Sequence, residues 1–442
     1  MVDRAVSSDS AVQRQLDRLA ALSPGADILG LERISALLAR LGNPERALPP
    51  VFHVAGTNGK GSTCAFLRAA IEAAGLTAHV YTSPHLVRFN ERIRLAGQLI
   101  DDALLAALLE ETLDSAAGME ISFFEATTAA AFLAFSRRPA DACIVEVGLG
   151  GRLDATNVIP APVACGIAQL GLDHQQFLGS RIEDVASEKA GIAKKGVPLV
   201  TQHYPDRLGE RIGEAAASAG AIWMPRGDRW DAIVYRQKLH YRDDRGKLQL
   251  PLPRLRGTHQ AMNAALAVAM LRSQRTVPVR DPALRAAMGW ADWPGRLQRL
   301  APGPLASILP AGSELWLDGG HNPAAARAVA DFFRAHVPSD RPFHIVLGLL
   351  ANKDCAGVLK PFANRAATLH AVPVPGHPHH EPADLAAAAR SGGLTAQTAA
   401  DVEAALGWIA RHADRERPPI VLVMGSLYLA GEVLRANGQP PA

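Results

Sequence analysis

The feature that most constrains the fold is an alternation of short apolar runs with Ala- and Leu-rich stretches of helical length. The apolar runs lie at residues 51–54, 142–147, 162–167, 315–317, 345–350 and 420–424. Stretches such as 64–74 and 103–113 lie between them and have the length of helices. Strands that are apolar throughout need cover on both faces, so the pattern predicts parallel α/β sheets flanked by helices.

Two domains are expected because 442 residues exceed what one hydrophobic core usually organises. The segment Trp293–Arg296 breaks helical periodicity, and a new series of strands and helices follows it. We therefore predict domains at residues 1–297 and 298–442. The polar, alternating segment 226–255, with a turn at 243–246, predicts a small β-ribbon attached to the first domain.

Composition narrows the class of protein. The chain is 48% hydrophobic and 20% charged, with a formal net charge of +3, as is typical of globular proteins. Because its basic residues form no blocks, we expect neither nucleic acid nor a membrane surface as a partner. The N-terminus lacks the apolar core of a signal peptide, and no apolar run reaches the ~18 residues of a spanning helix, which predicts a cytoplasmic protein. The four cysteines have no CxxC spacing and are expected to be reduced thiols.

The strongest chemical signal is HVAGTNGKGST at residues 53–63, which follows an apolar strand and precedes a helix. In that context, backbone N–H groups of a glycine-rich turn and a helix N-terminus surround phosphate oxygens, while a lysine offsets their charge. Lys60 is the candidate lysine. The usual phosphate-loop pattern is altered, since Val54 stands at the first glycine position and Gly61 follows Lys60. A tight turn without a ligand is the alternative.

Two further positions lie where strands of the predicted sheet end. Glu146 ends the apolar run before VGLGGR, and a carboxylate there is costly unless it is paired or coordinated. It is a candidate Mg²⁺ ligand, with a structural ion pair as the alternative. His174 follows the next strand, in LDHQQFLG, although a single histidine in a loop is more often structural.

Lys189 is placed on an apolar face of a predicted helix. It shares spacings of three and four residues with Ile182, Val185, Ala186 and Ala193. A lysine pointed inward must find a partner or lose its proton. A lysine that extends along the apolar surface to solvent, or an ion pair, would also explain the pattern.

Nine ordered strings, within a similarity that runs from about residue 29 to residue 434, resemble the folylpolyglutamate synthase and dihydrofolate synthase family, a branch of the Mur ligases. They are HVAGTNGKGST, YTSPHLVRFNERI, FFEATTAA, VEVGLGGRLDATN, LDHQQFLG, SEKAGI, WPGRLQ, LDGGHNP and GSLYLAGEVL. The resemblance implies a mostly parallel ATPase domain of phosphate-loop type with a small β-ribbon, followed by a smaller Rossmann-like domain. It also implies a monomeric, Mg²⁺-dependent ligase that uses ATP and an acyl phosphate to add L-glutamate to dihydropteroate and reduced folates.

The resemblance also assigns roles to single positions. It implies nucleotide contacts at Gly59, Lys60, Gly61, Ser62, Asn263, Arg296, Asp318 and Asn322. It implies that Ser83, Glu146 and His174 bind Mg²⁺. Lys60, Lys189 and His321 take catalytic roles, and Lys189 matches a lysine that the family carries in N-carboxylated form.

Contacts to the pteridine substrate are implied at Ser23, Pro24, Gly25, Ala26, Ser122, Phe123, Phe124, Glu125, Leu153, Asp154 and Ala155. Phe123 and Phe124 offer stacking faces, and Asp154 offers an acceptor for ring N–H groups. The segment LSPGAD differs from the string typical of bifunctional members, so a monofunctional folylpolyglutamate synthase is an alternative. Two further alternatives are another Mur-type amino-acid ligase and a nucleotide-gated ATPase or binding module. The histidines of GHPHHEP are expected on a surface loop rather than in a metal store.

Overall fold

The structure is a computed structural model that describes residues 5–22, 29–338, 340–363 and 365–441. The chain folds as two compact units, each an α/β structure as predicted. Unit 1 consists of Met1–Arg254 with His259–Asp292, and unit 2 of Leu255–Thr258 with Trp293–Ala442. No helix in the described ranges is long and apolar enough to cross a membrane.

Unit 1 is built on a sheet with the strand order β4-β3-β2-β5-β1-β6-β7-β8. The six strands from β2 to β8 in that order are parallel, and β3 and β4 continue the sheet antiparallel at one edge. The strands are β1 (Val51–Ala55), β2 (Ala78–Tyr81), β3 (Ile93–Leu95), β4 (Gln98–Leu99), β5 (Ala142–Glu146), β6 (Ala164–Ile167), β7 (Pro198–Thr201) and β8 (Ile222–Pro225). The two central strands, β1 and β5, are buried at every residue, as their apolar sequences require.

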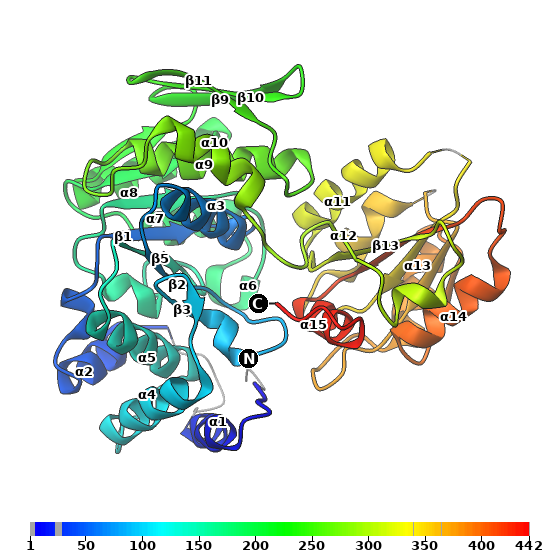
Figure 1. Ribbon diagram of the computed structural model, residues 1–442, viewed down its shortest axis with the longest axis horizontal. Helices are drawn as coiled ribbons and strands as arrows, with labels where there is room; N and C mark the ends of the chain where they lie inside the picture. Colours follow the sequence, from blue (N-terminus) through cyan, green and yellow to red (C-terminus); the bar gives the residue numbers. More distant parts are fainter. Residues whose placement is uncertain (1–4, 23–28, 339, 364, 442) are drawn as a thin grey trace. The chain divides into compact units, whose positions relative to one another are not determined.

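Helices cover both faces of this sheet (Figure 1). The cores on one face of the sheet include residues of α1 (Ser10–Leu22), α2 (Glu32–Arg40), α4 (Asp102–Ser115), α5 (Phe123–Arg137), α7 (Ile182–Ala190) and α8 (Asp206–Ala219). The other face carries α3 (Lys60–Ala73), α9 (Thr258–Arg272) and α10 (Asp281–Trp290). Gly166 of β6 lies so close to Met270 of α9 that a Cβ at Gly166 would fall 2.3 Å from the sulfur.

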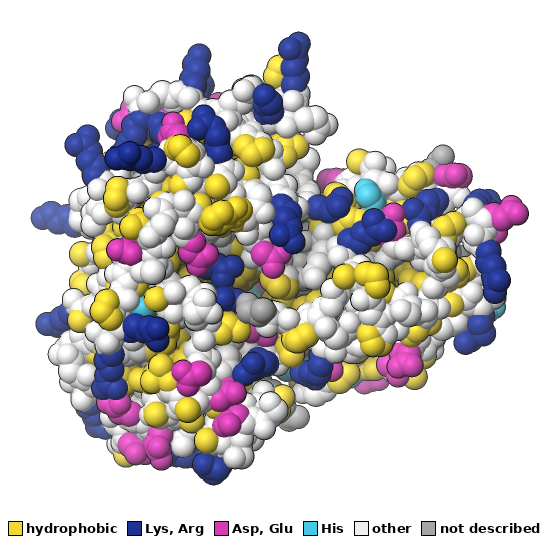
Figure 2. All heavy atoms as spheres, in the orientation of Figure 1, with side chains coloured by type: hydrophobic (Ala, Val, Ile, Leu, Met, Phe, Trp, Pro, Cys, Tyr) yellow, Lys and Arg dark blue, Asp and Glu magenta, His cyan; other side chains and the backbone are white. Residues whose placement is uncertain are grey.

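The predicted β-ribbon is an antiparallel sheet of three strands, β9 (Trp230–Tyr235), β10 (Lys238–Asp243) and β11 (Gly246–Pro251). An ion pair attaches it to α9, since Arg272 Nε lies 2.7 Å from Asp243 Oδ2 and both side chains are largely buried. The charged side chains of both signs are interspersed over the face seen in Figure 2.

Unit 2 contains a second sheet with the order β12-β13-β17-β14-β15-β16. All its neighbours are parallel except β12, which is antiparallel to β13. The strands are β12 (Gln298–Arg299), β13 (Glu314–Asp318), β14 (Phe343–Leu347), β15 (Thr368–Ala371), β16 (Ala396–Thr398) and β17 (Ile420–Met424). A core lies between one face of the sheet and α11 (Pro323–His336), α12 (Cys355–Leu359) and α13 (Pro382–Ser391). The helices α14 (Val402–His412) and α15 (Leu427–Ala436) contact strands of the same sheet.

The strand before His174 ends at Ile167, as its apolar run does, and Gln169 then pairs with Asn58 in a β-bridge. One expected element is shorter than predicted. Helix α7 ends at Ala190, where Gly191 is packed too tightly against Arg152 to accept a side chain. Ala193 therefore does not belong to the helical stripe, although Lys189 does.

Candidate active site

The glycine-rich loop joins β1 to α3 and leaves the N-terminus of that helix facing the loop. Gly59 caps α3 with a φ of +84°, a conformation that strongly favours glycine. Lys60, Gly61 and Ser62 form the first turn of the helix, where N–H groups have no partner inside the helix. A helix N-terminus with a neighbouring lysine is suited to bind phosphate oxygens.

Thr57 fixes the loop to the segment that follows β6. Its backbone N–H donates to Gln169 O at 2.8 Å, and its hydroxyl donates to Gly171 O at 2.8 Å. The loop is therefore held by hydrogen bonds to the segment that leads to His174.

Asn263 reaches the same loop from α9. A Cβ at Gly59 would lie 2.4 Å from Asn263 Oδ1, so the amide packs directly against the loop backbone. Gln260, which is one turn earlier on α9 and 1% exposed, accepts a hydrogen bond of 3.0 Å from Asn263 Nδ2. The sequence named Asn263 as a candidate contact but did not single out Gln260. The signal available for Gln260 was its position three residues before Asn263, which places the two side chains on the same side of a helix.

Glu146, Ser83 and Lys60 lie together at the carboxyl ends of β5 and β2. The Ser83 backbone N–H donates to Glu146 Oε2 at 3.3 Å, and Lys60 Nζ lies 4.0 Å from Glu146 Oε1. The Glu146 side chain is 6% exposed, and the Lys60 side chain 16%. A buried carboxylate beside a serine residue suits Mg²⁺, which prefers oxygen ligands and keeps several waters.

His174 has an unusual backbone conformation. Its φ of 50° places it in the left-handed region, which non-glycine residues seldom adopt outside functional or turn positions. Its backbone N–H donates to Asp173 Oδ1 at 2.8 Å, and Nε2 lies 3.9 Å from the same oxygen. The described residues contain no group of three or more His, Cys, Asp and Glu side chains placed to hold a metal. A metal ion bound by His174 and Glu146 would therefore also need oxygen ligands from a hydroxyl group, from water or from the substrate.

Lys189 is buried near the end of α7, with 4% exposure. Burial, with a smaller contribution from the Lys60 cation, lowers the pKa of Lys189 to about 7. The carboxylates of Asp154, Asp173 and Glu188 act in the opposite direction. The sequence prediction that this lysine points inward is confirmed. A large share of the amine is therefore neutral, and so nucleophilic, near pH 7.

The residues expected to bind a pteridine are divided by the structure into two groups. Ser122 caps α5 and forms a capping box with Glu125, which also pairs with Arg33 at 3.1 Å. Phe123 is buried against Phe89, whereas Phe124 is partly exposed and packs against Gly148. Phe124 thus has the more accessible ring. The positions Ser23, Pro24, Gly25 and Ala26 lie outside the described residues.

Asp154 belongs to the second group, with Leu153 and Ala155, after the VGLGG loop. The Asp154 carboxylate is 2% exposed and accepts hydrogen bonds from the backbone N–H groups of Leu149 and Thr156. Burial raises its pKa, while these bonds and the Lys189 cation oppose that shift. Leu153 is partly exposed and Ala155 is buried.

Unit 2 gathers the remaining predicted residues around the end of β13. Asp318 accepts hydrogen bonds from the N–H groups of Leu297 at 2.8 Å and Gly320 at 2.7 Å. Asn322 caps α11 by accepting from the Ala325 N–H, and His321 Nδ1 lies 2.9 Å from Gly319 O. A Cβ at Gly319 would lie 2.7 Å from Arg296 Nη1, so Arg296 also belongs to this cluster.

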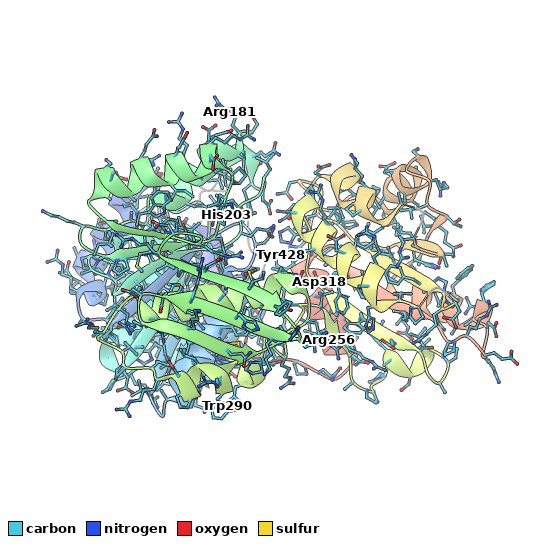
Figure 3. All side chains as sticks on the ribbon, turned by 90° about the horizontal axis from the view of Figure 1, so that it is seen from above. Arg181, His203, Arg256, Trp290, Asp318 and Tyr428 are labelled. Atoms are coloured by element: carbon cyan, nitrogen blue, oxygen red, sulfur yellow. The ribbon has the colours of Figure 1, made fainter. Side chains whose placement is uncertain are left out.

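The start of α15 adjoins that cluster. Figure 3 shows Asp318 and Tyr428 near one another, and Gly319 packs closely against Leu427. The histidine-rich loop also reaches Tyr428, because the rings of His377 and Tyr428 stack with centroids 3.7 Å apart. His379 and His380 have ring nitrogens within hydrogen-bond distance of backbone carbonyls.

Comparison with known proteins identifies the family of the chain. Residues 305–427 match the family model of the Mur ligase glutamate ligase domain. The dihydrofolate synthase/folylpolyglutamate synthase of Escherichia coli K12 is 34% identical over 407 residues, which span 92% of this chain and 90% of that protein.

Two solved structures resemble the whole chain. Escherichia coli FolC in complex with DHPP and ADP has a TM-score of 0.86 and 32% identity, and the match covers 98% of each chain. A bifunctional folylpolyglutamate synthase/dihydrofolate synthase with Mn, AMPPNP and L-glutamate bound has a TM-score of 0.83 and 32% identity, covering 99% of each chain. The resemblance drawn from the sequence is confirmed, and the chain belongs to the folylpolyglutamate synthase and dihydrofolate synthase family of Mur-type ligases.

Proposed function

We propose that this chain is an ATP-dependent ligase that forms an amide between L-glutamate and the carboxylate of dihydropteroate or of a reduced folate. The observation that carries the proposal is the cluster at the carboxyl ends of β1, β2 and β5. There a phosphate-type loop, the Lys60 cation and the Glu146 carboxylate lie next to one another. Family members whose names and solved structures include folates, ADP and L-glutamate support the same chemistry.

A divalent ion would be held by Glu146 and Ser83, with His174 as a third ligand. Mn in a related structure supports a divalent metal. When bound, such an ion offsets charge on the nucleotide phosphates. Lys60 adds a positive charge beside it, and the N–H groups at the start of α3 orient the same phosphates.

The reaction balances as two displacements. One oxygen of the substrate carboxylate attacks the γ-phosphorus of ATP, and ADP leaves with the electrons of the broken P–O bond. The amine of glutamate then attacks the acyl carbon, and phosphate leaves with that carboxylate oxygen while the amine loses a proton. Arg296, Asp318, Asn322, Asn263, Gly59, Gly61 and Ser62 are the proposed further nucleotide contacts, and His321 the proposed group near the terminal phosphate.

We propose an N-carboxylated Lys189 in the active protein. Its support is the burial that lowers the pKa of the amine to about 7, because only the neutral amine adds to CO₂. Carboxylation would replace a buried cation by an anion near the proposed metal ligands.

The ring of the substrate is assigned to Phe124 and Asp154, with Phe123, Ser122, Glu125, Leu153 and Ala155 around them. Phe124 supplies a partly exposed aromatic face, and Asp154 supplies an acceptor. We expect a cytoplasmic protein that is a monomer, and sedimentation of the purified protein tests the monomeric state.

Mass spectrometry of the products tests the function. The purified protein is given ATP, Mg²⁺ and L-glutamate with dihydropteroate in one sample and tetrahydrofolate in another. We expect products one glutamate heavier in both. Addition to tetrahydrofolate alone would identify a monofunctional folylpolyglutamate synthase. ATP hydrolysis that is indifferent to glutamate would favour a nucleotide-gated ATPase, and turnover of a nucleotide-linked muramyl substrate would favour a cell-wall ligase.

A further inference from the structure

Behind Asp154 lies a buried chain of polar side chains that the proposed reaction does not use. His53, in the middle of β1, is 0% exposed, and its Nε2 lies 2.8 Å from Thr156 Oγ1. Thr156 is also fully buried, and its hydroxyl lies 2.5 Å from Asp154 Oδ1. The three side chains therefore form a continuous path from the central strand of the sheet to the carboxylate assigned to the substrate.

The direction of these hydrogen bonds depends on the charge of Asp154. When the carboxylate is ionised it only accepts, so the Thr156 hydroxyl donates to it and must itself accept from a proton on His53 Nε2. If Asp154 were protonated and donated to Thr156, the hydroxyl would donate to Nε2 and the proton of neutral His53 would move to Nδ1. The histidine tautomer and the role of the carboxylate are thus linked.

The surroundings of His53 select one of these arrangements. Its Nδ1 is buried and has no hydrogen-bond partner among the described residues. An N–H at that position would be a buried donor without an acceptor, which proteins tolerate less readily than an acceptor without a donor. Burial, with a contribution from Lys194, also lowers the pKa of His53 to about 3, so the ring is neutral. The proton therefore lies on Nε2.

We infer that His53 and Thr156 are positioning residues that hold Asp154 as a hydrogen-bond acceptor for the N–H groups of the pteridine ring. The inference rests on the proposed function, because it takes Asp154 as a substrate contact. An ionised carboxylate has about four acceptor positions. Three are filled by Leu149 N–H, Thr156 N–H and the Thr156 hydroxyl, which leaves one for the substrate.

Three other titratable groups lie near this path. The Lys189 amine on α7, when it is a cation, favours the ionised form of Asp154, whereas its proposed carboxylated form would oppose it. Tyr81 on β2 is close enough to Asp154 for their charges to interact. Lys194 lies near His53 and donates to Asn157 O at 2.9 Å. Within the part of the chain that the structure describes, none of these groups hydrogen-bonds to the Asp154 carboxylate, so the Thr156 hydroxyl is the side-chain donor to test.

The test compares Thr156→Val with Thr156→Ser. Valine keeps the shape of threonine but removes the hydroxyl, whereas serine retains it. For Thr156→Val we expect the KM for dihydropteroate to rise about tenfold, as for a lost hydrogen bond to a charged group. The acid limb of kcat/KM should move up by about one pH unit, since the ionised carboxylate loses a donor. The KM for ATP should stay unchanged, and Thr156→Ser should restore both properties.

Thr112→Val is the matched control. Thr112, on α4, is also 0% exposed, and its hydroxyl has no hydrogen-bond partner among the described residues. Thr112→Val removes the same hydroxyl group as Thr156→Val but leaves the path from His53 to Asp154 unchanged. His53→Leu combined with Thr156→Val should be no worse than Thr156→Val alone, because the two residues act in series.

The outcomes separate this inference from the proposed function. A Thr156→Val protein with the KM and pH profile of Thr112→Val would overturn the positioning role while leaving the ligase intact. Equal loss of affinity for ATP and dihydropteroate would also overturn it, because that pattern indicates general damage. If the wild-type protein adds no glutamate to dihydropteroate, or if Asp154→Asn leaves its KM unchanged, the assignment of Asp154 to the substrate fails.

Discussion

Replacing Gly151 by alanine should disturb the position of Lys189 without touching its side chain. A Cβ at Gly151 would lie 2.7 Å from Glu188 O and 3.0 Å from both Lys189 Cα and Lys189 O. Ordinary contacts begin near 3.4 Å, so the last turn of α7 must shift by about 0.7 Å or the loop must shift away from it. Backbone atoms cannot rotate aside as the end of a flexible side chain can.

The size of the effect follows from that displacement. Overpacking of this kind costs about 1–3 kcal/mol of stability. Misplacement of a catalytic group by about 1 Å can reduce turnover on the order of 100-fold. We therefore expect kcat for ligation to fall by about 10- to 100-fold and the melting temperature to fall by several degrees.

The assay measures ligated product and thermal unfolding in parallel, with Gly209→Ala as the matched control. Gly209 lies within α8, and a Cβ there would meet no atom within 4 Å. Alanine in a helix is favoured over glycine by about 0.5–1 kcal/mol, so this variant should be slightly more stable and fully active. Wild-type turnover in a correctly folded Gly151→Ala protein would refute the claim that this contact positions Lys189.

Three further predictions concern nucleotide binding and pH. Gly59→Ala should raise the KM for ATP by about tenfold or more, because alanine is strained at a φ of +84° and its Cβ would displace Asn263. The KM for glutamate should stay unchanged. Steady-state kinetics measure both constants. The pKa of Lys189 is about 7 in the folded protein and near 10.5 in the unfolded chain, so between these pH values only the unfolded chain binds a proton at this amine. The free energy of unfolding of the wild-type protein should therefore rise relative to that of Lys189→Met as the pH increases from 7 to 10. Denaturant titrations without bicarbonate measure this difference. Burial lowers the pKa values of His344 and His370 from 6.5 to about 4, so the unfolded chain binds protons at these rings before the folded protein does. The melting temperature should therefore fall as the pH decreases from 6.5 to 4. In the His370→Gln variant, melting temperatures measured over this pH range should fall less steeply.

Local patterns were sufficient to predict the apolar strands β1, β5, β6, β13, β14 and β17, the glycine-rich turn between β1 and α3, and the inward orientation of Lys189, but not strands such as β2, β7 and β15. Each depends on residues that are close in sequence. The apolar run at 51–54 becomes a fully buried strand, and the spacing around Lys189 places it on the buried side of α7. The roles of single residues came mainly from the family resemblance, because a lone Glu146 or His174 does not specify a metal.

Contacts between distant parts of the chain could not be predicted in this way. Asn263 packs against Gly59 only because α9 lies on the same face of the sheet as α3. The path from His53 to Asp154 likewise requires β1 to lie beside the loop after β5. Helix α7 ends at Ala190, and the close packing of the following Gly191 against Arg152 is another contact between distant parts of the chain that no helical period reveals.

The central claim is that ATP activates the substrate carboxylate as an acyl phosphate before glutamate attacks. Dihydropteroate labelled with ¹⁸O in its carboxylate is incubated with the protein, ATP, Mg²⁺ and unlabelled L-glutamate, and the released phosphate is examined by mass spectrometry. We expect one ¹⁸O atom in phosphate for each glutamate added. Ligation that releases phosphate without ¹⁸O would contradict the account.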